Sequence, residues 1–200
     1  MGSRDDTRHL PPKTGEKGQL SREGSFAESK EPDEPEKPCY STAIFMRLGI
    51  NKSLKLTGSQ TIAVYKGFCD TNGAVWFSTD SLATGMAEKK EEEFVRAVKD
   101  GFVVEMYFAI GKKGEGTNEI AYKAEVIDIV SDAIGRRSPD KNLTPAEWET
   151  DRSRIWIKLQ KLVPFTSLTT ADFIVASTGN VLVDSIRRSQ YHFGYIRRKL

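Results

Sequence analysis

The composition of the chain changes abruptly at residue 38, and this change decides which part can fold. Residues 1–38 contain five of the eight prolines, seven Lys/Arg and nine Asp/Glu, but only five hydrophobic residues. A segment with so little apolar surface cannot offset the conformational entropy that is lost on ordering. We therefore expect a disordered tail over 1–38 and one folded domain over 39–200, which is long enough to bury a core of its own.

Composition also disfavours membrane, secreted and metal-binding proteins. No apolar run approaches the roughly 18 residues that a membrane-spanning helix needs. The start, Met-Gly-Ser-Arg-Asp-Asp, lacks the apolar stretch of a secretory signal, so we expect an intracellular protein, cytoplasmic or nuclear. Cys39 and Cys69 are the only cysteines, and His9 and His192 the only histidines. With no zinc-binding cluster available, we expect free thiols, no metal and no cofactor.

The folded part alternates between strand-like and helix-like patterns. Ile62–Tyr65 and Val75–Phe77 are short β-rich runs, and the Asn-Gly signal at 72–73 lies between them, which predicts a hairpin. Leu82–Asp100 is rich in helix-forming residues, and Gly101 follows as a C-terminal cap, so this segment predicts a helix.

Further strands are predicted downstream. Val103–Ile110 and Ala121–Ile129 flank a polar loop, so we expect two adjacent antiparallel strands. Arg154–Val163 alternates in polarity and ends before Pro164, as a further strand would. About five strands without strict strand–helix alternation predict an α+β fold, with a small curved mixed sheet or an open β-barrel and flanking helices. The last expected elements are a short helix or turn at 169–173 and segments of strand or helix at 180–186 and 191–196.

No enzymatic motif is evident in the sequence. The Gly-rich segment 111–116 lacks the spacing of a P-loop and precedes a strand, so we interpret it as a flexible hairpin loop whose Lys112 and Lys113 can touch phosphate. No histidine accompanies a serine or cysteine nucleophile in a motif. Glu91–Glu93 fit a solvated helix face. We therefore expect a protein that is not an enzyme.

The three tryptophans lie in different contexts. Trp156 belongs to an alternating strand and is expected in the core. Trp148 lies in a polar stretch with few apolar neighbours, so we expect a partly exposed aromatic plate that faces a ligand. Trp76 precedes Ser78 and Thr79, whose small polar groups could bond a base edge while the indole stacks on the base.

Several short motifs resemble a family of nucleic-acid-binding domains. Val75–Thr79 (VWFST) resembles the Trp-x-Ser-Thr signature of YTH domains, and the order of the helix and strands that follow is similar. Trp148 and Trp156, eight residues apart, resemble that family's Trp-containing loop and its next strand, and Arg188-Ser-Gln190 is similar to its late Arg-x-x-Gln segment. The resemblance covers roughly 73–196 and suits the related EVE and other PUA-like domains equally.

This resemblance implies a PUA-like fold and a reader of a modified, N6-methyladenine-like base in RNA or DNA. Trp76 and Trp148 would form the walls of an aromatic cage around a flipped methylated base, and the main chain at Phe77 and Ser78 would read its edge. The expected site is Asp70, Asn72, Trp76, Phe77, Ser78, Thr79 and Trp148 for the base, and Lys112, Lys113, Arg187, Arg188 and Arg197 for phosphates. Arg198 and Lys199 continue the basic C-terminal end, through which we expect salt-sensitive binding.

Two other interpretations stay open. Tyr65-Lys-Gly67, followed by the run from Trp76, loosely resembles the nicotinamide-site segments of ADP-ribosyltransferases. That family needs a catalytic glutamate on a late strand, whereas no Glu follows Glu149 and the strand at 121–129 offers only Glu125. The third interpretation is a protein-interaction module whose surface around Trp148 docks a peptide.

Overall fold

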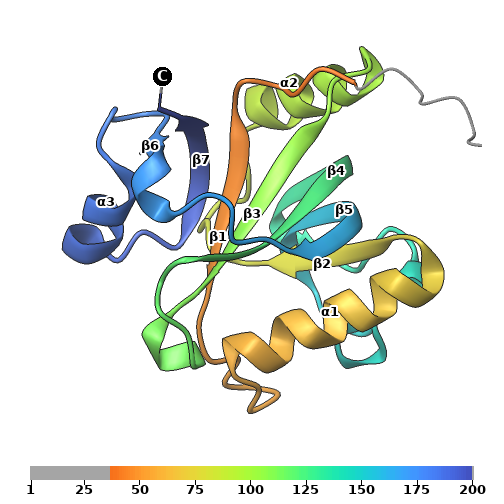
Figure 1. The fold of residues 1–200 in the computed structure, drawn as a ribbon. Helices are drawn as coiled ribbons and strands as arrows, with labels where there is room; N and C mark the ends of the chain where they lie inside the picture. Colours follow the sequence, from red (N-terminus) through yellow and green to blue (C-terminus); the bar gives the residue numbers. More distant parts are fainter. Residues whose placement is uncertain (1–36, 200) are drawn as a thin grey trace, which may run out of the picture. The chain divides into compact units, whose positions relative to one another are not determined.

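The computed structural model describes residues 37–199, so the predicted tail over 1–38 lies outside the described residues except for Lys37 and Pro38. Three helices and seven strands make up this part of the chain (Figure 1). In chain order they are β1 (Ala43–Leu48), α1 (Gly58–Asn72), β2 (Val75–Thr79), α2 (Glu88–Lys99), β3 (Val104–Ile110), β4 (Ile120–Arg136), β5 (Ser153–Pro164), β6 (Phe173–Val175), α3 (Leu182–Ser189) and β7 (Phe193–Arg198).

All seven strands belong to one mixed sheet with the order β2-β5-β4-β3-β1-β7-β6. β1 runs parallel to β3, and the other neighbouring pairs are antiparallel. The predicted α+β class and mixed sheet are therefore confirmed. The antiparallel pairing of β3 with β4, with Met106 opposite Ala124, confirms the pair of adjacent strands expected on either side of the Gly-rich segment.

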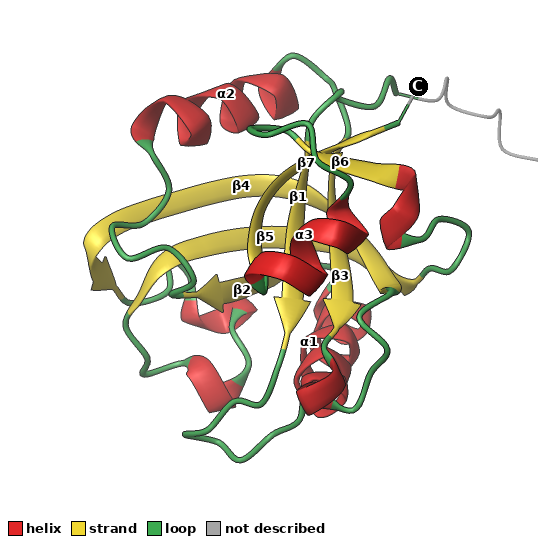
Figure 2. Cartoon of the chain, turned by 90° about the vertical axis from the view of Figure 1, so that its left-hand side faces the viewer, coloured by secondary structure: helices red, strands yellow, loops and turns green. Residues whose placement is uncertain are grey.

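The sheet is strongly curved, as the long strands β4 and β5 show in Figure 2. Three strands separate β2 from β1 in the sheet, yet Thr79 Oγ1 at the end of β2 lies 4.0 Å from Met46 Sδ in β1. Ser81 Oγ lies 3.9 Å from the same sulfur. Within residues 37–199 no backbone ladder joins β2 to β1, so the sheet is not closed into a barrel.

Side chains alternate between two cores on the two faces of the central strands. Along β3, Met106 and Phe108 belong to the larger core, to which α1 and α2 contribute, whereas Tyr107 and Ala109 belong to the smaller core, to which α3 contributes. Every residue of β3 is buried, because the strand packs into the larger core on one face and into the smaller core on the other.

The prediction of a hairpin over 62–77 is wrong for its first strand. Ile62–Tyr65 lies inside α1, which begins with a capping box: Gln60 N donates to Thr57 Oγ1, and Thr57 N donates to Gln60 Oε1. Gly73, with φ of 78°, ends the helix in the left-handed conformation. The Asn-Gly pair therefore caps a helix instead of turning a hairpin. Only the strand at 75–77 is confirmed, as β2.

The predicted helix 82–100 is confirmed from Glu88 onward as α2. Its expected first turns are irregular instead, because Gly85 has φ of 76° and Met86 N donates to Ser131 Oγ of β4 at 2.8 Å. The strand expected at 154–163 is confirmed as β5.

The Gly-rich segment is more closely packed than a flexible loop. Lys112–Gly114 form a 3-10 turn, η1, and a Cβ at Gly114 would come within 2.9 Å of Leu48 O and 3.0 Å of Gly58 N. The absence of a side chain thus lets η1 pack directly against the start of α1. None of the helices in residues 37–199 has the length and apolarity to span a membrane.

Candidate functional site

Both tryptophans of the expected aromatic cage lie in the larger core. Trp76 is 3% exposed and Trp148 is 4% exposed, so the prediction of a partly exposed Trp148 is wrong. Trp156 is fully buried, as predicted, and its Nε1 donates to Arg136 O at 2.8 Å. Core burial accounts for all three indole rings without a ligand, although Trp76 Nε1 is buried and has no hydrogen-bond partner within residues 37–199.

Trp148 is buried because α1 supplies a partner that the local sequence does not show. Its ring stacks on Tyr65, with 4.2 Å between ring centroids and 18° between ring planes. Burial raises the pKa of Tyr65 above its ordinary value, and its hydroxyl bonds Ser78 Oγ at 3.2 Å. Trp76 has a different neighbour, Lys158, whose Nζ lies 5.9 Å from the indole centroid.

The other expected base-binding residues divide between two places. Phe77 packs edge-on against Phe108 in the core, and Ser78 N donates to Tyr65 Oη at 3.4 Å. Thr79 is buried and bonds Ser81 Oγ at 2.8 Å.

Asp70 and Asn72 lie instead in the last turns of α1. Asp70 pairs with Lys66 one turn earlier, and Asn72 Nδ2 donates to Phe68 O at 2.9 Å. Both side-chain contacts lie within α1 and stabilise the end of the helix.

The expected phosphate-binding residues do not form a single cluster. Lys112 and Lys113 are exposed on η1, beside the start of α1. Arg187 and Arg188 are exposed in the last turn of α3. Arg197 lies in β7, where its Nε donates to Thr42 Oγ1 at 3.2 Å, and together with Arg198 and Lys199 of the basic C-terminal end it lines the cavity described next.

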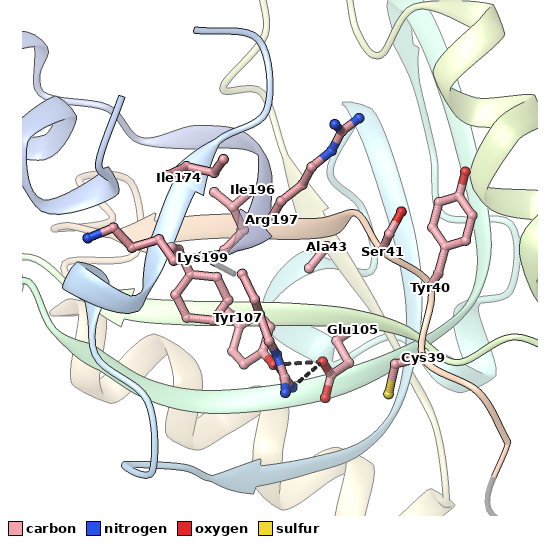
Figure 3. Close-up of a pocket in the computed structure, with 12 residues that line it drawn as sticks. Cys39, Tyr40, Ser41, Ala43, Glu105, Tyr107, Ile174, Ile196, Arg197 and Lys199 are labelled. Carbon is pink, nitrogen blue, oxygen red and sulfur yellow. Dashed lines mark hydrogen bonds and ion pairs between the residues drawn. The ribbon is translucent and has the colours of Figure 1, made fainter. Parts of the chain in front are cut away.

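A cavity of about 930 Å³ opens beside the C-terminal end of β7, on the face of the sheet that carries the smaller core (Figure 3). Its lining combines an apolar floor with a polar rim that contains one carboxylate and three cations. The apolar and aromatic lining residues are Tyr40, Ala43, Tyr107, Phe173, Ile174 and Ile196, and the remainder are Cys39, Ser41, Glu105, Arg197, Arg198 and Lys199.

Glu105 of β3 is the centre of a polar cluster in this cavity. Tyr107 Oη donates to its Oε2 at 2.6 Å, Arg198 Nη2 donates to the same oxygen at 3.0 Å, and Lys123 Nζ donates to Oε1 at 3.3 Å. Arg198 Nη2 also donates to Tyr107 Oη at 2.9 Å, which closes a triangle that Figure 3 shows in part. The Glu105 side chain is 10% exposed.

The surrounding donors keep this carboxylate ionised. Burial alone would raise the pKa of Glu105, but the hydrogen bond from Tyr107 and the charges of Arg198 and Lys123 outweigh it, so the pKa lies below its ordinary value. The pKa of Tyr107 is raised by burial and by its bond to Glu105. The bond to Tyr107 likewise helps to raise the pKa of Arg198.

The sequence-based site omitted Glu105 and Tyr107, and it included Arg198 only as part of the basic C-terminal end. A signal was present, because Glu105 is the one charged residue in the run Val103–Ile110, and a charge within a buried strand needs a partner. The identity of that partner was not encoded locally, since 93 residues separate Glu105 from Arg198.

Comparison of the chain with models of known protein families, with curated proteins and with solved structures finds no match. The geometry of the residues themselves is therefore the basis for a functional proposal.

Proposed function

We propose that this protein is a nucleic-acid-binding module and not an enzyme. The observation that carries the proposal is the cavity beside β7, where Arg197, Arg198 and Lys199 adjoin an apolar floor whose accessible part includes the half-buried Tyr40 and Ile174. Cations beside a recessed apolar surface match the two parts of a nucleotide, because a phosphate is anionic and a base has apolar faces. Lining residues in the cavity carry three positive charges and one negative charge, which favours an anionic ligand.

We also propose, from the motifs around Trp76 and Trp148, that the nucleic acid carries a modified base. Both indoles are buried, so each would contact a base only after becoming exposed, and for Trp148 this means leaving its stack on Tyr65. A preference for methylated over unmethylated oligonucleotides would support this part of the proposal. Equal affinity for every matched pair would remove it and leave the general binding function standing.

The general function is tested by neutralising the three cations together. Fluorescence anisotropy would follow labelled RNA and DNA oligonucleotides, single- and double-stranded, over a range of salt concentrations. We expect the wild type to bind with a salt-dependent affinity, and the triple variant Arg197→Gln, Arg198→Gln, Lys199→Gln to bind at least about tenfold more weakly. For a single strand, the loss of three phosphate contacts would flatten the slope of log K against log salt by about 2.

A matched control changes three exposed cations outside the cavity, Lys52→Gln, Lys55→Gln and Arg137→Gln. This control has the same net charge as the cavity variant, so it measures the effect of lost charge that is not located at the cavity. Absence of wild-type binding to every oligonucleotide would overturn the proposed function. An equal loss of affinity in both triple variants would show that the cavity is not the binding site.

A further inference from the structure

Arg198 is anchored at one end of its guanidinium group. Within residues 37–199, its hydrogen bonds to Glu105 Oε2 and Tyr107 Oη both use Nη2. A guanidinium has five N–H donors in one rigid plane, so the donors on Nη1 and Nε stay available for a ligand. The Arg198 side chain is 54% exposed, so these donors can be reached from solvent.

The anchors themselves are held firmly. The Glu105 side chain is 10% exposed, and Tyr107 is fully buried. The centroid of the Tyr107 ring lies 4.8 Å from the centroid of the Phe173 ring. The bond of 2.6 Å from Tyr107 Oη to Glu105 Oε2 links the two anchors to each other. An arginine fixed in this way loses less side-chain entropy when it binds an anion than a free surface arginine does.

The cluster also has a surplus of positive charge. One carboxylate, that of Glu105, faces two cations, Arg198 and Lys123. Arg197 and Lys199 line the same cavity. A phosphate near Arg198 would therefore be attracted by more positive charge than Glu105 neutralises.

The apolar floor limits which nucleotides can enter. Phe173 and Ile196 are fully buried and form the underside of this floor, whereas the half-buried Tyr40 and Ile174 present the apolar surface that a base can contact, within the cavity that the exposed cations of β7 also line. A base that is paired and stacked in a duplex does not reach a recessed floor unless it is extruded, which costs the free energy of its pairing and stacking. An unstacked base in a single strand reaches it without that cost.

We infer that the cavity holds one unstacked nucleotide unit, with its phosphate on Arg198 and its base against the apolar floor, and that Glu105 and Tyr107 are positioning residues for Arg198. This inference rests on the proposed function. It adds the class of ligand, which is a single strand, and a site that is separate from the two tryptophans.

The positioning role is tested with Tyr107→Phe, which removes the hydroxyl that bonds both Glu105 and Arg198 but keeps the buried ring. We expect this variant to bind a single-stranded oligonucleotide about 3- to 10-fold more weakly with an unchanged salt slope, because Arg198 still reaches the phosphate but is no longer held in place. Its control is Tyr122→Phe, which removes the hydroxyl of a half-buried tyrosine of β4 outside the cavity.

Arg198→Gln provides the second variant, since the side chain is 54% exposed and Glu105 keeps Lys123 as a partner. We expect at least a tenfold loss of affinity and a salt slope that is flatter by about 0.7, the contribution of one phosphate in a single strand. Arg137→Gln, at an exposed position after β4, is its control. Unfolding temperatures of all four variants would show whether a change in affinity reflects a change in stability.

Three ligands separate failure of this inference from failure of the proposed function: a single-stranded oligonucleotide, its duplex, and adenosine 5′-monophosphate. Tighter binding of the single strand, with the variant effects above, supports the inference. Equal binding of strand and duplex, with Arg198→Gln and Arg137→Gln indistinguishable, overturns the inference and leaves the proposed function intact. Binding of the mononucleotide alone, lost in Arg198→Gln, supports the cavity as a nucleotide site and overturns the nucleic-acid function. No binding of any ligand overturns both.

Discussion

Replacement of Trp148 by Ala decides whether this indole is part of the core or a plate that binds ligand. Trp148 is 4% exposed and stacks on Tyr65 with 4.2 Å between ring centroids. A buried Trp changed to Ala typically costs about 3–5 kcal/mol, through lost burial and the cavity that is left behind. The change also uncovers one face of Tyr65, so we expect a loss within this range.

Urea unfolding followed by far-UV circular dichroism would measure this loss without relying on the fluorescence of the deleted indole. With an unfolding slope of about 2 kcal/mol per molar urea, a loss of 4 kcal/mol lowers the midpoint by about 2 M. Trp148→Phe is the matched variant, because a smaller ring can still stack on Tyr65. We expect it to lose less than half as much stability as Trp148→Ala.

A loss of less than about 1 kcal/mol in Trp148→Ala would refute this reasoning, since changes of that size are typical of residues that contribute little to a core. The indole would then lie outside the core in solution for much of the time. That outcome would favour the aromatic cage, in which Trp148 is free to meet a base.

Further predictions concern two glycines and the buried carboxylate. A Cβ at Gly116 would lie 2.3 Å from Ile110 O, so Gly116→Ala should destabilise the fold by about 2–3 kcal/mol in urea unfolding. Gly67 lies in α1 with no atom within 4 Å of such a Cβ, so Gly67→Ala should instead stabilise it by up to about 1 kcal/mol, and a loss there would contradict the packing of α1. The folded-state pKa of Glu105 is lowered, so the stability that its ionised form contributes is present above its unfolded-state pKa of about 4.3 and is lost as pH falls through the folded-state pKa. Glu105→Gln should therefore be less stable than the wild type at pH 7, with a difference that shrinks toward pH 3; a pH-independent difference in urea midpoints would show that Glu105 is not ionised in the folded state.

Strands with a strong local pattern were predictable from the sequence. β3 is a run of buried residues, and β5 alternates in polarity along most of its length. β4 follows β3 after a short connection, so their antiparallel pairing needed only local information. β1 was not predicted, because its position in the sheet depends on β3 and β7, which lie far along the chain.

The first strand of the expected hairpin was predicted wrongly because too few residues were considered. Ile62–Tyr65 contains β-branched and aromatic residues that favour strands, but propensity is a weak guide over four residues. The capping pair Thr57 and Gln60 and the terminal Gly73 together specify a helix of fifteen residues. These signals were in the sequence, and the Asn-Gly pair was assigned to the wrong kind of turn.

The chemistry available to the protein was determined by sequence alone: a basic C-terminal end, three tryptophans and strands of an α+β sheet. The burial of Trp148 against Tyr65, and the contact of Glu105 with Arg198, were decided by tertiary structure. Arg198 of β7 reaches Glu105 of β3 because only one strand, β1, lies between β7 and β3 in the sheet. These two contacts join residues that are 83 and 93 positions apart, so they depend on which strands become neighbours in the curved sheet. The strand order follows from the burial of both faces of the sheet at once. That burial is a property of the whole chain, and no local segment determines it.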